Sequence, residues 1–197
     1  MVLNTTCGTL GGNLHREENH DHTKSQTRGP RVHRGDYATA FREWHPLAKQ
    51  GNAKAQYNLG VMYGNGLGVT QDYPRSVKWY RKAAEQGNAI SQFNLGFMYD
   101  KGRGIPQDYA EALQWYRKAA KQGNADAQFF LGFMYDAGRG VPQDYAQAHM
   151  WYNLAASRFP TGEGRDIAVN NRDLLAKVMT PAQISEAQRL AREWKPK

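Results

Sequence analysis

The sequence repeats itself with a fixed period of 36 residues. Residues 93–120 and 129–156 are identical at 20 of 28 positions. An Asp-Tyr pair recurs at the same interval, beginning at Asp36, Asp72, Asp108 and Asp144. A period of this length is typical of solenoids, in which each repeat buries its apolar surface only by stacking on its neighbours. The 36-residue period therefore predicts a stack of similar units and not a fold closed around one central core.

Each repeat is predicted to hold two helices. In the best-conserved unit, Asn88 can cap a first helix that ends before Gly102, a residue suited to the left-handed position after a helix. Asp108 can cap a second helix, whose apolar residues recur at i, i+4, i+7 and i+8 from Ala112 and form one buried stripe. The predicted fold class is therefore all-α. The first helices are expected over 52–65, 88–101 and 124–137, and the second helices over 72–86, 108–122 and 144–157.

The two ends of the repeat array depart from the period. A lone helix of the second type is expected over 36–50, and Pro46 inside it should bend it or break its last turns. After residue 157 the period fails, and we expect a helix over 166–179 followed by a last helix that starts with a capping box at Thr180 and ends near Trp194. These two helices would cap the solenoid. The predicted domains are a disordered N-terminal tail (1–34), a solenoid of a half repeat and three full repeats (35–157), and the capping helices (158–197).

Composition and charge narrow the class of protein. The net charge is +8, from 26 Lys and Arg against 18 Asp and Glu, and the mean hydropathy is −0.79. A basic chain favours acidic partners, but the charge is spread along the sequence without a dense run of Lys and Arg, so we expect no nucleic-acid binding. No apolar run approaches the ~20 residues of a membrane-spanning helix. The N-terminal residues lack the features of a signal peptide, which makes the cytoplasm the default compartment, and we expect a monomer.

No catalytic residue, metal site or cofactor is predicted. The single cysteine, Cys7, lies in the N-terminal tail and excludes an intramolecular disulfide. His45 and His149 fall within predicted helices without a recurring acidic partner. The tail histidines lie near carboxylates, but their spacing matches no closed zinc site; they are His15, His20, His22 and His33.

The glycine-rich loops after the first helices are interpreted as turns. Phosphate-binding loops lie between a strand and a helix, whereas these loops follow helices. We expect an apolar residue of each loop to point inward; these residues are Val69, Ile105 and Val141.

The repeated residues resemble a known family. The pattern A-x-A-Q-[YF]-N-L-G-x-M-Y-x-x-G-x-G-V-x-Q-D-Y-x-x-A-x-x-W-Y-x-K-A-A-x-Q-G-N, over residues 36–157, is similar to the Sel-1-like repeat (SLR), a relative of the tetratricopeptide repeat. Residues 172–196 resemble the C-terminal caps of bacterial members. The resemblance implies a right-handed superhelix of helix pairs and the role of a non-catalytic adaptor or scaffold. Within the repeats, Phe130 departs from the pattern, because Asn58 and Asn94 stand at its position in the earlier copies.

Two other functions stay open from the sequence. Cysteine-rich members of the family are linked to β-lactam binding or hydrolysis, which makes a β-lactam-binding or hydrolysing enzyme the alternative. The lack of paired cysteines in this chain disfavours it. The chain would also suit a purely structural module within a larger complex.

The resemblance also implies a binding surface. In the related two-helix repeat, the first helices line a concave groove that binds a peptide or protein. Aligning the Leu-Gly pairs of the three repeats gives the candidate partner-binding residues: Lys54, Tyr57, Val61, Ile90, Phe93, Phe97, Asp126, Phe129 and Phe133. Tyr57, Phe93 and Phe129 recur as aromatics, so they either bind the partner or pack between helices. The other six vary against a fixed frame, which makes them the better candidates for specificity.

Overall fold

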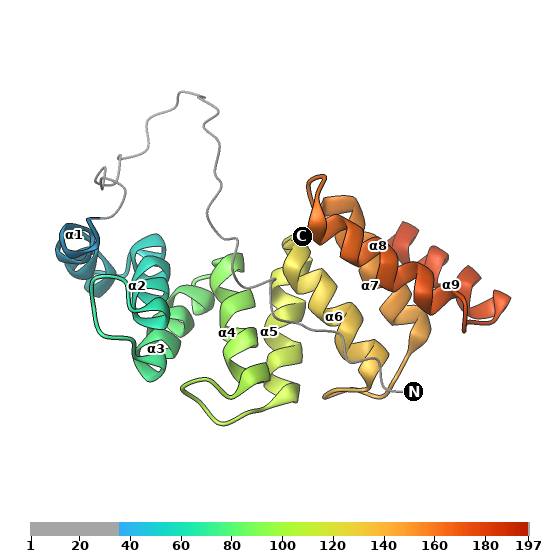
Figure 1. Cartoon of the computed structure of the whole chain (residues 1–197), viewed down its shortest axis with the longest axis horizontal. Helices are drawn as coiled ribbons and strands as arrows, with labels where there is room; N and C mark the ends of the chain where they lie inside the picture. The colour runs from blue at the N-terminus through green and yellow to red at the C-terminus, as the bar shows by residue number, and fades with distance from the viewer. Residues whose placement is uncertain (1–35, 197) are drawn as a thin grey trace. The chain divides into compact units, whose positions relative to one another are not determined.

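The structure, a computed structural model, describes residues 36–196, which form nine helices and no strand. The N-terminal tail predicted over 1–34 lies outside the described residues. In chain order the helices are α1 (Tyr37–Lys49), α2 (Ala53–Asn65), α3 (Tyr73–Glu85), α4 (Ala89–Lys101), α5 (Tyr109–Lys121), α6 (Ala125–Ala137), α7 (Tyr145–Arg158), α8 (Glu163–Ala176) and α9 (Pro181–Glu193) (Figure 1). From α1 to α8, each helix packs against the next one in the chain. The predicted all-α solenoid of paired helices is confirmed.

Local capping sets the helix boundaries, as the sequence predicts. The side-chain oxygen of Asn88 accepts a hydrogen bond from the backbone N–H of Ser91 at 2.8 Å, and this bond caps α4. At its other end α4 stops at Gly102, which has a left-handed conformation with φ of 63°. Asp108 accepts hydrogen bonds from the backbone of Ala110 and Glu111 and so caps α5. The same two capping patterns recur in the repeats before and after this one.

Pro46 does not break the last turns of α1, which corrects one of the two outcomes expected from the sequence. The helix continues to Lys49, and the N–H of Gln50 still bonds to the carbonyl of Pro46 at 3.1 Å. Proline removes one donor from the helix, but the turn that follows it keeps its own hydrogen bond. Packing of Ala48, which is fully buried, holds the last turn against α2.

Within each repeat the two helices meet where a glycine faces a tyrosine ring. A Cβ atom added to Gly96 in α4 would lie 2.8 Å from the ring of Tyr116 in α5, closer than real Cβ contacts. The lack of a side chain therefore lets the tyrosine ring lie directly on the backbone of the first helix. The equivalent pairs are Gly60 with Tyr80 and Gly132 with Tyr152.

Buried glutamines join consecutive repeats. The side-chain amide of Gln92 in α4 donates to the carbonyl of Ala84 in α3 at 3.1 Å and accepts from Gln122 at the end of α5 at 2.8 Å. Each such glutamine thus connects three helices, and its counterpart Gln56 does the same one repeat earlier. In the third repeat Gln128 keeps only its donor bond, to the carbonyl of Ala120.

The loops after the first helices also pack against the preceding repeat. Gly104 has φ of 71°, and a Cβ there would overlap the backbone of Tyr73 at the start of α3. Val69 and Ile105 pack against the buried clusters, as the sequence predicts. The loops therefore hold consecutive repeats together.

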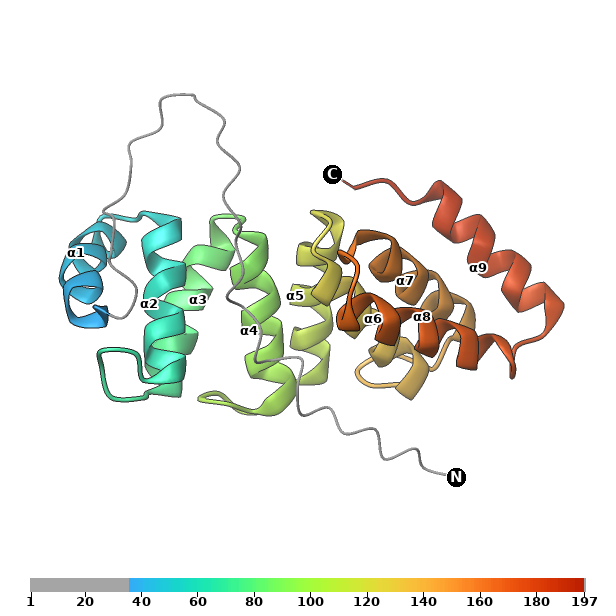
Figure 2. The same cartoon turned by 45° about the horizontal axis from the view of Figure 1, so that its top comes forward.

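The C-terminal helices both pack on α7 (Figure 2). Arg172 in α8 donates to the side-chain oxygen of Asn153 in α7 at 3.1 Å. The rings of Trp151 in α7 and Trp194, just after α9, lie 6.2 Å apart. The helix α9 packs on α7, the second helix of the last repeat, whereas the second helices α3, α5 and α7 pack on first helices and not on one another. Among the helices of residues 36–196, none is long and apolar enough to cross a membrane.

Two glycine-to-alanine changes should differ in their effect on stability. Gly96→Ala should lower the free energy of unfolding by ~1–3 kcal/mol, because the new methyl group overlaps the Tyr116 ring. Gly164→Ala is the matched control, since its Cβ would meet only ordinary contact at 3.5 Å. There alanine should be neutral or raise stability by at most ~1 kcal/mol through its better helix propensity. Urea unfolding followed by circular dichroism measures both, and equal shifts in one direction would contradict the glycine–tyrosine assignment.

Candidate functional site

The nine candidate residues lie on one face of the three first helices. In each of α2, α4 and α6 they are spaced i, i+3 and i+7, which places them on the same side of the helix. We call this surface the first-helix face; it consists of Lys54, Tyr57, Val61, Ile90, Phe93, Phe97, Asp126, Phe129 and Phe133. Its three positions per helix differ in burial and are described in turn.

The middle residue of each helix packs on the tyrosine of its own repeat. The ring centroids are 6.2 Å apart for Tyr57–Tyr80, 5.7 Å for Phe93–Tyr116 and 5.4 Å for Phe129–Tyr152. Phe129 is only 7% exposed, whereas Tyr57 and Phe93 are half-buried. The packing interpretation therefore fits Phe129, which offers little surface to a partner.

The first residue of each helix varies most in chemistry. Lys54 is exposed, Ile90 is 42% exposed and Asp126 is half-buried. Burial raises the pKa of the Asp126 carboxyl, and a hydrogen bond from its own backbone partly opposes this shift. One structural position thus carries a cation, an apolar group and a carboxylate in three successive repeats.

The last residue of the face lies beside a basic loop residue in α4 and α6. Val61, Phe97 and Phe133 are half-buried. The guanidinium carbon of Arg103 lies 5.6 Å from the Phe97 ring centroid, and that of Arg139 lies 4.8 Å from Phe133, both within cation–π range. Sequence reasoning missed these arginines. The signal was available, because each stands between the two glycines of a loop.

Phe130 links the faces of two helices through an aromatic cluster. Its ring centroid lies 5.6 Å from Phe93, 6.0 Å from Phe97 and 5.4 Å from Tyr116. One repeat earlier Asn94 occupies this position, and its amide nitrogen is buried without a hydrogen-bond partner among the described residues. The boundary between α4 and α6 is therefore aromatic, whereas the boundary between α2 and α4 carries an amide.

A hollow lies on another part of the molecule. It has a volume of about 410 Å³ and is lined by α3 and by Ile105 of the loop between α4 and α5. None of the nine candidate residues lines it. The lining residues are Pro74, Val77, Lys78, Arg81, Lys82, Glu85 and Ile105.

The structure gathers no metal-binding group in the part of the chain that it describes. Within residues 36–196, no three His, Cys, Asp or Glu side chains lie close enough to hold an ion. Cys7 and the four tail histidines fall outside these residues. His45 stacks on Phe41, with ring centroids 5.1 Å apart. His149 lies near Arg172 and Asp173 of α8.

The environment of His149 predicts a pH effect on stability. Burial, followed by the charge of Arg172, lowers the pKa of His149 below its usual value of 6.5, while Asp173 acts in the opposite direction. The unfolded chain therefore binds the proton first, so this stabilisation is complete above about pH 6.5 and is lost as the pH falls below it. His149→Gln should reduce the loss of unfolding free energy between about pH 7 and about pH 5. Urea titrations of wild type and variant at each pH measure the difference, and equal slopes would contradict it.

Comparison with known proteins identifies relatives of the same architecture. A family model described as Sel1 repeat matches residues 53–88, 89–124 and 125–158. The crystal structure of a Sel1 repeat protein from Oxalobacter formigenes is 33% identical with a TM-score of 0.66, and the match covers 80% of this chain and 64% of that one. The crystal structure of c5321 is that of a protective antigen that is present in uropathogenic Escherichia coli strains and displays an SLR fold. It is 30% identical with a TM-score of 0.58, and the match covers 78% of this chain and 40% of that one. A search of curated proteins gave no match.

Proposed function

Because this chain belongs to the Sel1 repeat family, we propose that it is a non-catalytic adaptor that binds a peptide or protein partner through the first-helix face. Repeats of this family typically mediate protein–protein interaction. The observation that carries the proposal is the variation at Lys54, Ile90 and Asp126 on a frame that otherwise repeats. Ile90 supports it further, because a large apolar side chain that is 42% exposed favours a covering partner.

The chemistry of the face fits a partner with apolar anchors and acidic or carbonyl groups beside them. Ile90, Phe97 and Phe133 offer apolar surface at intervals along the repeats. Arg103 and Arg139 lie over two of these rings, and a guanidinium held on a ring can still donate its N–H groups to carboxylates or backbone carbonyls. Apolar anchors with polar groups at the rim are the recognition mode of peptides that dock in helical grooves.

Truncation of apolar residues of the first-helix face should weaken binding more than folding. Peptides selected by display on the immobilised full chain would be titrated against wild type, Ile90→Ala and Phe97→Ala by fluorescence anisotropy. Each variant should lose about tenfold or more in affinity, since anchor residues dominate interfaces. Leu174→Ala is the matched control, because Leu174 is an apolar residue of α8 that is 51% exposed outside the face. It should leave affinity unchanged.

Circular dichroism melts of the same variants distinguish binding from packing. Ile90→Ala should melt like wild type, because Ile90 is the most exposed apolar residue of the face. Two outcomes would contradict the proposal: an affinity loss in Leu174→Ala as large as in Ile90→Ala, or a loss of helicity in step with affinity. The binding surface would then lie elsewhere on the chain.

A further inference from the structure

The positive charge is concentrated on one set of helices. Helices α3 and α5 carry seven Lys or Arg and two Glu, whereas α2, α4 and α6 carry two Lys and three Asp. Charges that are spread along the sequence are therefore unevenly shared between first and second helices. Of the seven cations, only Arg75 forms an ion pair within residues 36–196, with Asp72 at 3.2 Å. Among the other six, Arg81 and Arg117 donate hydrogen bonds to the hydroxyls of Tyr99 and Tyr135 but keep their charge unpaired within these residues. The six together form a cationic surface.

The hollow on α3 combines apolar and cationic groups. Six of its lining residues follow the spacing i, i+3, i+4, i+7, i+8 and i+11 and form one stripe along the helix. Pro74 and Val77 together with Ile105 supply apolar surface. The cations of the stripe are Lys78, Arg81 and Lys82, and Glu85 stands at its end. An apolar side chain flanked by carboxylates fits this lining.

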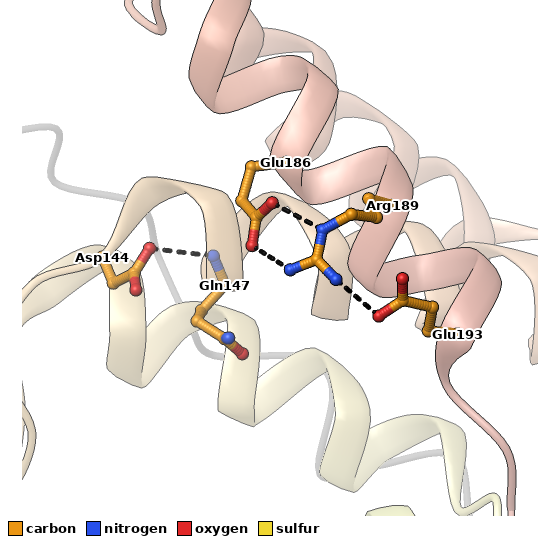
Figure 3. Close-up of polar contacts among 5 residues, drawn as sticks. All are labelled: Asp144, Gln147, Glu186, Arg189 and Glu193. Atoms are coloured by element: carbon orange, nitrogen blue, oxygen red, sulfur yellow. Dashed lines mark hydrogen bonds and ion pairs between the residues drawn. The ribbon is translucent and has the colours of Figure 1, made fainter.

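The chain itself shows how such a face can be covered. Trp151 in α7 occupies the repeat position of Trp79 and Trp115, and it is only 8% exposed because α9 packs on α7. The ring of Trp194 lies 6.2 Å from it. The helix α9 is amphipathic, with Ala187 fully buried. On its polar side Arg189 pairs with Glu186 and Glu193, at 2.6 Å each (Figure 3).

The equivalent faces of α3 and α5 carry lysines where α7 carries an apolar residue. Lys82 lies 5.2 Å from the centroid of Trp79, and Lys118 lies 3.8 Å from that of Trp115. Both tryptophans are half-buried. At the same position α7 has Leu154, which is 9% exposed. A helix that covers α3 and α5 must therefore meet ammonium groups, which favour carboxylates on the partner.

We infer that the second helices α3 and α5 form a docking surface for an acidic amphipathic helix of a protein partner, laid over them as α9 lies over α7. The surface, called here the basic face, consists of Lys78, Trp79, Arg81, Lys82, Trp115, Arg117, Lys118 and Lys121. It shares no residue with the first-helix face, so it stands independently of the function proposed above. Because most of its cations are solvent-exposed, salt should weaken the association.

The probe is a synthetic peptide of residues 180–194 that carries Arg189→Glu and Arg192→Glu, an acidic form of α9. Labelled with fluorescein and titrated into the full chain, it should bind saturably and lose about tenfold or more in affinity from about 50 mM to about 500 mM NaCl. The unaltered peptide should bind more weakly. Lys82→Glu combined with Lys118→Glu should weaken binding of the acidic peptide about tenfold or more, because two attractive contacts become repulsive.

A matched pair of charge reversals separates docking from general attraction. Arg165→Glu combined with Lys177→Glu changes the net charge equally on exposed residues outside the basic face, and it should leave the affinity within about twofold of wild type. Phe97→Ala should also leave it unchanged, which distinguishes this surface from the first-helix face. Circular dichroism melts confirm that both double variants are folded.

Four outcomes of the peptide titrations would overturn the inference, and a fifth comes from a nucleic-acid control. In the first, the acidic peptide shows no saturable binding, and in the second it binds the variant with Lys82→Glu and Lys118→Glu as tightly as wild type. In the third, the two double variants lose equal affinity for it, and in the fourth the unaltered peptide binds wild type as tightly as the acidic peptide does. A labelled duplex DNA provides the test for nucleic acid. If it binds more tightly than the peptide and loses that affinity in the same double variant, the basic face serves nucleic acid and the inference fails.

Discussion

The contact between a glycine of the first helix and a tyrosine of the second sets the geometry of every repeat. Tyr116 is fully buried on Gly96, and Tyr152 is 1% exposed on Gly132. Burial raises the pKa of Tyr80, the tyrosine of the first repeat, since a phenolate would be poorly solvated there. Any side chain at the glycine would push the two helices apart, so the remaining contacts of the repeat depend on this approach.

The glutamine bridge that joins consecutive repeats stops at the last repeat. The three-helix bridge that Gln92 makes needs a donor from the end of the second helix. At the end of α7 Arg158 stands at the position of Gln122, and its guanidinium lies at Trp194 and not at Gln128. The side-chain oxygen of Gln128 consequently has no hydrogen-bond partner among the described residues. Arg158 instead lies over the ring of Trp194, at 5.1 Å from its centroid. One residue change thus ends the bridge and joins α7 to the segment that follows α9.

Local signals predicted most of the fold, whereas the sites depended on non-local contacts. Asn88, Gly102 and Asp108 act on backbone groups within a few residues, so their caps were readable from the sequence. The burial of Phe129 was not readable, because helical spacing indicates which residues share a face but not which neighbour covers it. The basic face was not predicted, since charge was counted along the chain and not helix by helix, whereas the cations gather on α3 and α5.

The two proposed surfaces are joined by the recurring Trp-Tyr pair of the second helices. Consecutive helical residues point about 100° apart, so one pair can serve two sides of a helix. In α5, Tyr116 packs on Gly96 and on Phe93 of the first-helix face, while Trp115 lies beneath Lys118 of the basic face. Rotation of α5 would therefore disturb both surfaces at once. Exposed side chains such as Ile90 and Lys82 lie on different helices, so evolution can change one surface without moving the backbone that supports the other.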